Sequence, residues 1–386
     1  MSKVRVLRVI TRLNVGGPAH HVLLLSQRLG EPFETLLVSG QEPPGEARAT
    51  EWIAQYGVPV EYIPSLGREV QVWRDWGSIW ALWRLMRSYN PHIVHTHTAK
   101  AGAVGRLAAW LARVPLRIHT FHGHSFEGYF SPWRHWLYRQ IERLLARLAH
   151  RIVVISERQR RDIVERFRIA PPEKVVVIPL GFPLERLDKY DPEAVEALRT
   201  AWGGRDSLLL GWIGRMVPIK RVDKLLQAVA EMNDPPRPFR LVLVGDGPEK
   251  PRWEALARQL GLSEKVVWAG LRWDIPEVLR ALDAVVLVSD NEGTPVTLIE
   301  ALACGVPVAS TPVGGVPDLL AEGEYGYLLQ EPLPESLRLF IAQLPQARAK
   351  AQKAQPFIRS YYSEERLIKD IRALYRQLLS SPNFAP

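Results

Sequence analysis

Short runs of aliphatic and β-branched residues alternate along this chain with segments of helical pattern, such as residues 17–30 and 222–232. Strands and helices that alternate at this pitch predict parallel sheets covered by helices on both faces. The predicted strands are residues 3–10, 33–39, 58–64, 91–98, 116–122, 150–156 and 174–180, followed by 207–214, 239–245, 265–270, 283–289 and 306–311.

The alternation is interrupted once, at residues 179–192, a segment that carries Pro and Gly. Such a break is typical of a linker between domains. We therefore predict an α/β protein with two Rossmann-like domains, each a doubly wound parallel sheet, separated by a cleft. The first comprises residues 1–182 and the second residues 183–358, and residues 359–386 form a final helix that Ser363 is placed to cap.

Length and composition agree with two soluble globular domains, since the 386 residues are 47% hydrophobic and 24% charged. Cys304 is the single cysteine, which excludes a disulfide framework and a multi-cysteine zinc site. Residues 1–13 alternate apolar and basic side chains and predict a strand instead of a signal peptide. No stretch is long and apolar enough to span a bilayer, so we expect a cytoplasmic protein.

The excess of positive charge lies in the first half of the chain. Residues 1–180 hold 25 Lys and Arg against 14 Asp and Glu, a net charge of +11, whereas residues 181–386 hold 25 against 27. This asymmetry favours an anionic partner, which a membrane surface, a phosphorylated acceptor or nucleic acid would supply. A solvated basic surface explains the same count, and no nucleic-acid-binding motif is present.

Glycines follow two of the predicted strands, at the edge where ligands of such sheets bind. Gly16 and Gly17 follow the first strand and would let a phosphate or a sugar approach the backbone, although a plain tight turn explains them equally. Gly245 and Gly247 follow a strand of the second half, but Lys250 stands where a dinucleotide fingerprint requires its third glycine. This departure excludes a nicotinamide-dependent dehydrogenase.

The segment SDNEGTPVTLIEALACGVPVAS, residues 289–310, follows a buried strand and contains two glutamates, Glu292 and Glu300. Thr294 has the chemistry of a helix N-cap, and Pro295 has that of the first residue of a helix. The unpaired amides of a helix N-terminus are natural partners of a phosphate or of sugar hydroxyls. Here they belong to Gly293, Thr294, Val296 and Thr297.

These motifs resemble the retaining glycosyltransferases of family 4, which have the GT-B fold. The resemblance rests on residues 14–22 (NVGGPAHHV), 211–230 (GWIGRMVPIKRVDKLLQAVA), 241–249 (LVLVGDGPE) and 292–320, and it spans nearly the whole chain. It implies transfer of a sugar from a nucleotide-diphosphate sugar, most often a UDP-sugar, to a lipid-linked or polysaccharide acceptor of the cell envelope. It also implies that no metal or other cofactor is needed and that the last helix crosses back to the N-terminal domain.

The resemblance assigns roles to individual residues of the donor site. Glu292 would hold the hydroxyls of the donor sugar near the reacting centre, and Glu300 would bind the ribose. Arg215 and Lys220 would neutralise the donor diphosphate, whose charge grows as the glycosidic bond breaks. Many members have Glu-Gly-Phe-Gly where this chain has Glu292-Gly293-Thr294-Pro295, a departure that bears on the identity of the sugar.

All ten histidines lie between residues 20 and 150. His122 follows a predicted strand and falls where the family places a histidine that faces the donor sugar, so we expect it to be catalytic, ahead of His119 and His124. His95 and His97 would share one face of a strand, a spacing that zinc could use. No carboxylate or thiol close in sequence completes such a site, and we expect no metal.

Two stretches combine aromatic and basic residues. Trp73, Trp76, Trp80 and Trp83 recur at helical spacing, and residues 130–151 mix aromatics with arginines. Such helices either lie in a lipid interface or bury a core stripe beneath solvated charges. Together with the charge of the first half, they favour peripheral attachment to the inner face of an anionic membrane.

Two other functions are also compatible with the sequence. Glu292 and Glu300 could be the acid and the nucleophile of a glycosidase, although that leaves Arg215 and Lys220 without a role. A nucleotide-sugar epimerase with the same fold, or a silent sugar-nucleotide-binding protein, would share the donor site.

Overall fold

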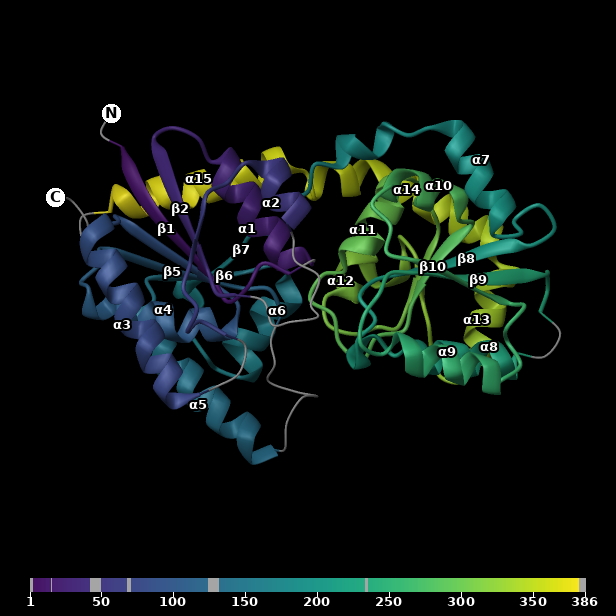
Figure 1. Cartoon of the computed structure of the whole chain (residues 1–386), viewed down its shortest axis with the longest axis horizontal. Helices are drawn as coiled ribbons and strands as arrows, with labels where there is room; N and C mark the ends of the chain where they lie inside the picture. The colour runs from purple at the N-terminus through teal and green to yellow at the C-terminus, as the bar shows by residue number, and fades with distance from the viewer. Residues whose placement is uncertain are drawn as a thin grey trace. The chain divides into compact units, whose positions relative to one another are not determined.

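The structure is a computed structural model, which describes residues 3–14, 16–41, 50–67, 71–123, 132–232 and 235–381 (Figure 1). The chain forms two compact units. Unit 1 comprises Met1–Phe182 together with Glu364–Pro386, and unit 2 comprises Pro183–Ser363. Within the predicted linker, the short 3₁₀ helix Leu184–Asp188 buries Leu184 and Leu187, so this segment is part of the packing of unit 2.

Unit 1 contains a parallel sheet in the order β3-β2-β1-β4-β5-β6-β7. Its strands are β1 (Val4–Ile10), β2 (Phe33–Ser39), β3 (Val60–Tyr62), β4 (Ile93–His97), β5 (Leu116–Phe121), β6 (Arg151–Val154) and β7 (Val175–Val177). Its helices are α1 (Gly17–Arg28), α2 (Thr50–Tyr56), α3 (Val72–Tyr89), α4 (Ala99–Leu111), α5 (Pro132–Leu148), α6 (Glu157–Arg161) and α15 (Glu364–Leu379).

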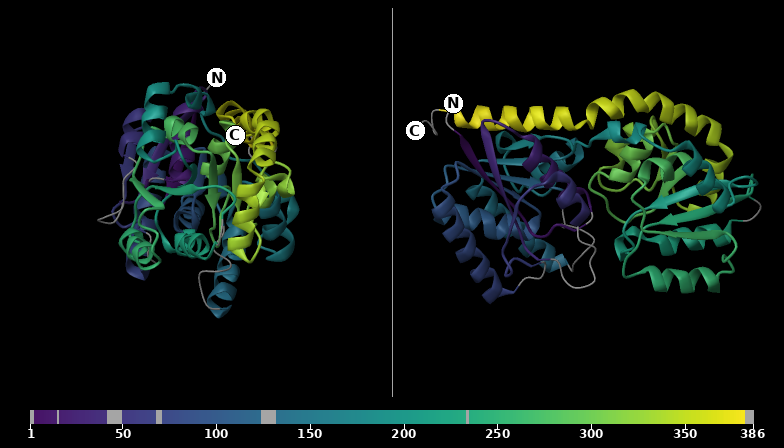
Figure 2. Two further views of the ribbon diagram at one scale, coloured as in Figure 1. Left: turned by 90° about the vertical axis from the view of Figure 1, so that its right-hand side faces the viewer. Right: turned by 45° about the horizontal axis from the view of Figure 1, so that its top comes forward.

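Unit 2 contains a second parallel sheet in the order β10-β9-β8-β11-β12-β13, with helices on both faces (Figure 2). Its strands are β8 (Leu208–Ile213), β9 (Phe239–Val244), β10 (Val266–Gly270), β11 (Ala284–Leu287), β12 (Val308–Ser310) and β13 (Tyr327–Leu328). Its helices are α7 (Pro192–Ala201), α8 (Val222–Glu231), α9 (Lys250–Gln259), α10 (Ile275–Ala281), α11 (Val296–Ala303), α12 (Val316–Leu319), α13 (Leu333–Ala342) and α14 (Leu344–Tyr361).

The last helix, α15, packs into the core of unit 1. Leu367, Ile371, Leu374 and Leu378 recur at helical spacing, and all four are buried in the cluster that also contains Val6 of β1. This face of the sheet is covered by α1 and α15, whereas α3 and α4 cover the opposite face, on which the side chains of Leu7 and Val9 lie. The predicted fold class, including the return of the last helix, is therefore confirmed.

Each sheet has one point at which the strand order reverses, between β1 and β4 in unit 1 and between β8 and β11 in unit 2. Loops that leave the carboxyl ends of these strands flank a crevice, the usual ligand site of such sheets. In unit 2 these are the loops that follow β8 and β11, and in unit 1 those that follow β1 and β4. The reversal points therefore predict that ligands bind at these loops.

Candidate active site

The loops after β8 and β11 of unit 2 are joined by a backbone hydrogen bond and by ion pairs. The amide of Asp290 donates to the carbonyl of Ile219 at 2.9 Å. Lys220 Nζ lies 2.5 Å from Glu292 Oε1, the same oxygen to which Ser289 Oγ donates at 2.6 Å. The side chain of Glu292 is only 8% exposed, so these contacts fix the carboxylate in one position. The structure thus brings together Lys220 and Glu292, which lie 72 positions apart.

Two cations at the start of α8 also bind Asp290 in the loop after β11. Arg221 Nη1 donates to Asp290 at 2.8 Å, and Lys224 Nζ donates to the other oxygen of Asp290 at 3.1 Å. Burial would raise the pKa of Asp290, but the hydrogen bonds from these two cations outweigh it and hold the pKa below its ordinary value. Arg221 adopts the left-handed conformation, with φ of 49°, where the chain turns into α8.

Glycines let neighbouring loops touch through their backbones. Gly314, after β12, has φ of 54°, and a Cβ there would lie 1.6 Å from the carbonyl oxygen of Glu292. A Cβ at Gly245 would lie 1.9 Å from the carbonyl oxygen of Gly214, and one at Gly247 would lie 2.4 Å from that of Met216. The paired glycines after β9 are therefore required for packing against the loop after β8, which explains a motif that only partly resembles a dinucleotide fingerprint.

The N-terminus of α11 lies directly after Glu292. The predicted cap was wrong by one residue, because Pro295 is the N-cap and the helix begins at Val296. The hydroxyl of Thr294 is buried and has no hydrogen-bond partner within the ranges that the structure describes. Thr297 Oγ1 donates to the carbonyl of Ile213 at 3.1 Å. No group in the described part of the chain accepts a hydrogen bond from the amides of the predicted donor contacts, Gly293, Thr294, Val296 and Thr297.

Glu300 lies in a different environment from Glu292. It is buried in α11 and forms an ion pair with Arg186 of the 3₁₀ helix Leu184–Asp188. Burial raises the pKa of Glu300, and the nearby Arg186 only partly opposes this effect. Sequence reasoning missed Arg186, because it lies in the segment interpreted as a linker and 114 positions from its partner.

The raised pKa of Glu300 predicts a pH-dependent stability. A group whose pKa is higher in the folded state stabilises the fold below its unfolded pKa and loses that contribution as the pH rises through the folded pKa. The variant Glu300→Gln cannot ionise, so its melting temperature relative to that of the wild type should rise between pH 4 and pH 7. Melting curves of both proteins across this range test this, and a constant difference would contradict it.

In unit 1 the predicted residues lie around the reversal point between β1 and β4. Gly16 is the N-cap of α1, in extended backbone, and Gly17 is the first residue of that helix. His122 follows β5, and its Nε2 lies 3.0 Å from Nδ1 of His97, the last residue of β4. His119 is completely buried and packs against Gly102 of α4. His124 lies outside the described residues.

A compact histidine cluster surrounds His122. One nitrogen of each of His21, His97 and His122 lies within 4.8 Å of the others, and the rings of His95 and His97 stack at 4.4 Å. Burial is the main cause that lowers the pKa of each of these four imidazoles, to about 3 for His122. Arg8, buried in β1, adds its positive charge to the same effect. All four rings are therefore neutral near pH 7.

Three of the four tryptophans of α3 face outward, whereas Trp83 is partly buried and packs against the core. Trp73 is 88% exposed and Trp76 and Trp80 are each 58% exposed, whereas Ile79 and Leu82 of the same helix are buried in the core. The interpretation of the tryptophans as a core stripe is therefore wrong for these three. The helix α5 also exposes apolar side chains, namely Trp133, Trp136, Leu137, Ile141 and Leu144.

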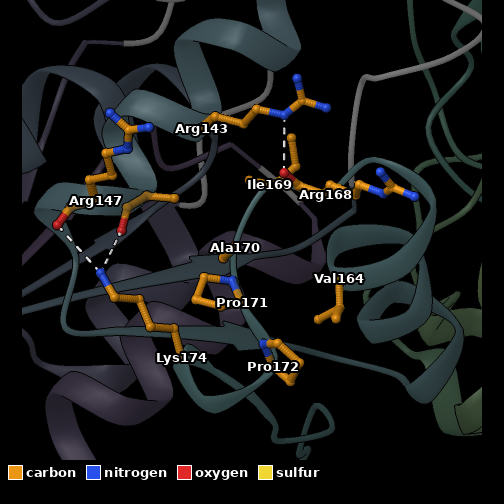
Figure 3. Close-up of a pocket in the computed structure, with 10 residues that line it drawn as sticks. Arg143, Arg147, Val164, Arg168, Ile169, Ala170, Pro171, Pro172 and Lys174 are labelled. Atoms are coloured by element: carbon orange, nitrogen blue, oxygen red, sulfur yellow. Dashed lines mark hydrogen bonds between the residues drawn. The ribbon is translucent and has the colours of Figure 1, made fainter.

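A basic cavity of about 480 Å³ lies beside the C-terminal half of α5 (Figure 3). Its lining includes Arg143, Arg147, Arg168 and Lys174, and none of the described residues that line it is acidic. Lys174 Nζ donates to the carbonyl of Ala149 at 3.0 Å, and Arg143 donates to the carbonyls of residues 167 and 168. The cavity lies at the amino ends of β6 and β7, the sheet edge opposite to His122.

No helix in the described parts of the chain has both the length and the apolar character needed to cross a membrane.

Comparisons with known proteins agree with this architecture. The model of the Glycosyl transferase 4-like domain matches residues 16–181, and that of Glycosyl transferases group 1 matches residues 202–359. The chain is 30% identical over 281 residues to the UDP-Gal:alpha-D-GlcNAc-diphosphoundecaprenol alpha-1,3-galactosyltransferase of Escherichia coli, covering 70% of each protein.

Two further matches extend over most of the chain. The D-inositol 3-phosphate glycosyltransferase of Corynebacterium urealyticum is 29% identical over 332 residues, which are 80% of this chain and 77% of that protein. The crystal structure of Anabaena HepE in complex with UDP and glucose superposes with a TM-score of 0.81, covering 97% of this chain and 100% of that one. The identity to HepE is 20%, so this likeness concerns the fold.

Proposed function

Because the chain belongs to the family 4 glycosyltransferases of the GT-B fold, we propose that it transfers a sugar with retention of configuration from a UDP-sugar to a lipid-linked or polysaccharide acceptor of the cell envelope. The observation that carries the donor half of this proposal lies at the reversal point of unit 2. There an ion-paired lysine and glutamate stand beside the unbonded amides of a helix N-terminus.

The groups at the reversal point of unit 2 suit the binding of a sugar diphosphate. Unpaired amides and the positive end of the helix dipole attract the phosphate oxygens, and Lys220 supplies a full charge close to them. Glu292, held by Ser289 and Lys220, offers a carboxylate to sugar hydroxyls or to positive charge that develops on the anomeric carbon. Glu300 and its partner Arg186 would hold the ribose.

Arg215 and Lys220 would support a reaction that needs no metal. When the glycosidic bond breaks, negative charge accumulates on the departing UDP. Arg215, Lys220 and the amides of α11 can stabilise that charge without a divalent ion. We expect transfer to be unaffected by EDTA, and retention is tested by comparing the anomeric configuration of donor and product by NMR.

Two observations support a lipid-linked acceptor, namely the name of a relative and the exposed residues of unit 1. The Escherichia coli relative is named for a sugar carried on diphosphoundecaprenol, a lipid-linked acceptor. The described part of unit 1 exposes apolar residues on α3 and α5 and also contains a cavity lined by cations, a combination that suits an anionic lipid surface. We propose that unit 1 docks through these residues, its docking face, on the inner face of the membrane that carries the acceptor.

Removal of the exposed tryptophans should weaken membrane docking. We expect the triple variant Trp73→Ser, Trp76→Ser, Trp80→Ser to bind vesicles about tenfold or more weakly, because each exposed indole would otherwise enter the lipid interface. Sedimentation with vesicles of anionic and of neutral lipid measures this.

A matched control is Trp273→Ser, an exposed tryptophan of unit 2, which should bind vesicles like the wild type. The double variant Arg147→Ala, Arg168→Ala should lose affinity only for anionic vesicles, by about 1 kcal/mol for each arginine. Unchanged binding of the triple variant would contradict the docking face.

The donor is tested first by thermal unfolding of the purified protein with UDP, GDP and ADP. A ligand bound only by the folded state stabilises it by about 2.7 kcal/mol at one hundred times its Kd, which corresponds to a rise of about 5–10 °C for a unit of this size. A melting temperature that rises selectively with UDP supports the proposal. A selective rise with GDP or ADP would instead show that the donor carries guanine or adenine. An epimerase would convert a UDP-sugar in the absence of any acceptor, whereas a transferase releases UDP only when an acceptor is present.

A further inference from the structure

Arg8 lies inside the sheet of unit 1 among groups that accept hydrogen bonds. It is completely buried in β1, and no carboxylate in the described part of the chain pairs with it. Its Nη1 lies 3.1 Å from His97 Nε2 and 3.4 Å from His95 Nδ1, and its Nη2 lies 3.4 Å from the hydroxyl of Tyr375. A guanidinium in a protein stays protonated and has only donors, so each of these atoms must offer it a lone pair.

This contact determines the tautomer of His97. A neutral imidazole has one N–H and one lone pair. Burial, followed by the nearby charges of His95 and Arg8, holds the pKa of His97 well below its ordinary value, so the ring is neutral. Because Nε2 accepts from Arg8, the proton of His97 is on Nδ1.

The tautomer of His97 in turn determines that of His122. His97 Nδ1 lies 3.0 Å from His122 Nε2. Because Nδ1 of His97 carries the proton, it donates the hydrogen bond and Nε2 of His122 accepts it. His122 is neutral as well, with a pKa that burial and Arg8 lower to about 3. Its own proton is therefore on Nδ1, and that atom is buried without a partner in the described part of the chain.

We propose that Arg8 is a positioning residue that acts through His97 to fix His122 as a hydrogen-bond donor, which presents Nδ1–H to an oxygen of the bound substrate. This inference rests on the proposed function, because it gives the chemical form in which His122 takes part in transfer. A histidine in this form cannot accept a proton from the acceptor hydroxyl. It contributes by holding a hydroxyl or phosphate oxygen in place.

The unsatisfied atoms nearby indicate the kind of group that is bound. His21 is only 2% exposed, and neither of its ring nitrogens has a hydrogen-bond partner among the described residues. Its ring lies 4.8 Å from that of His122. An unpaired buried donor costs about 1–3 kcal/mol. A hydroxyl can both accept from His122 Nδ1–H and donate to the lone pair of His21, so a sugar hydroxyl satisfies His122 and one of the two nitrogens of His21.

A metal ion held by His21, His97 and His122 is the competing explanation of this cluster. Ligation by His97 Nδ1 would require its proton to move to Nε2, which then faces a guanidinium donor at 3.1 Å. It would also place a second positive charge beside Arg8. The relay and the metal site therefore exclude each other, and one measurement separates them.

The test is the tautomer of His122 in the substrate-free protein, read from long-range ¹⁵N–¹H NMR spectra of protein labelled in its histidines. We expect the neutral Nδ1–H form throughout pH 5–8. In Arg8→Met, which keeps a buried apolar chain of similar length, His122 should become a mixture of tautomers, and Arg8→Lys should largely restore the single form. The control His92→Phe, at the other end of β4, should leave the spectrum of His122 unchanged.

Activity supplies the second readout. Arg8→Met should lower kcat about 10–100-fold, the range typical for loss of a group that orients a ligating histidine, with KM changed much less, and kcat should acquire a pH dependence between pH 5 and 8. His97→Phe keeps the ring shape, removes both contacts and should show the same loss if Arg8→Met fails to fold.

An Nε2–H form of His122 in the wild type, one bound metal ion per chain that is lost in His21→Phe, or full kcat in Arg8→Met would each overturn the proposal. Failure of the proposed function is distinguished from these outcomes. A chain that shows the Nδ1–H form and its dependence on Arg8, but transfers no sugar, would support the relay and contradict the transfer reaction.

Discussion

The variant Glu292→Gln should fold like the wild type and lose about 10²–10³-fold in kcat, the range found when one group that stabilises developing charge is removed. Gln keeps the size of the side chain and can still accept from Ser289, which donates to Glu292 Oε1 at 2.6 Å. It lacks the negative charge that Lys220 fixes in place and that would face the reacting sugar. The rate of UDP release with a lipid-linked acceptor measures the change.

The matched control is Glu264→Gln, an exposed carboxylate of unit 2, which should keep wild-type kcat and melting temperature. The melting temperature of Glu292→Gln should stay within a few degrees of that of the wild type, because the amide fills the same space. A variant with near-normal turnover would remove Glu292 from the reaction. A variant that unfolds would instead show that the pair with Lys220 is needed for the fold.

The second large effect is expected for Lys220→Ala, which should weaken UDP binding by about 1.5–3 kcal/mol, the size of a charge-assisted hydrogen bond. This corresponds to about 10–150-fold in Kd. The lysine ends a short 3₁₀ helix after β8 and contacts Glu292, which precedes the N-terminus of α11. Titration calorimetry with UDP measures the loss.

Because Lys220 touches Glu292, the two variants should not be additive. In Lys220→Ala the carboxylate of Glu292 remains without its partner and repels the diphosphate. In the Glu292→Gln background, Lys220→Ala should therefore weaken the binding of UDP less. The coupling free energy between the two substitutions should be about 0.5–3 kcal/mol. Lys224→Ala, which removes only a contact with Asp290, is the control. Equal losses in both backgrounds would show that the pair acts independently.

The fold could be predicted from the sequence because each strand and helix carries its own local pattern of apolar residues. The strand β13 was missed, since two residues show no periodicity. The tryptophans of α3 were ambiguous for a related reason. Helical spacing shows that Trp73, Trp76 and Trp80 share a side of the helix, but not whether that side meets the sheet or the solvent.

The partners of the site residues could not be predicted, because they depend on strand order. In the sequence, Arg8 is one of several basic residues of the first predicted strand. In the structure β4 lies next to β1, and this brings His95 and His97, 87 and 89 positions away, to its guanidinium. Arg186 and Glu300, 114 positions apart, meet because the 3₁₀ helix Leu184–Asp188 packs beside α11. Neither pair leaves a local signal.

The composition of unit 1 from two distant pieces of chain affects how the protein folds during synthesis. The sheet of unit 1 is complete by Phe182, but the apolar face under α15 stays uncovered until Glu364–Pro386 has been made. Unit 2, Pro183–Ser363, lies between them and can finish first. At about 5–20 residues per second, translation of unit 2 takes about 10–40 s. A nascent chain should therefore expose Val6, Ile93 and Leu116 during that interval, and a chaperone that binds apolar surface would bind the first half.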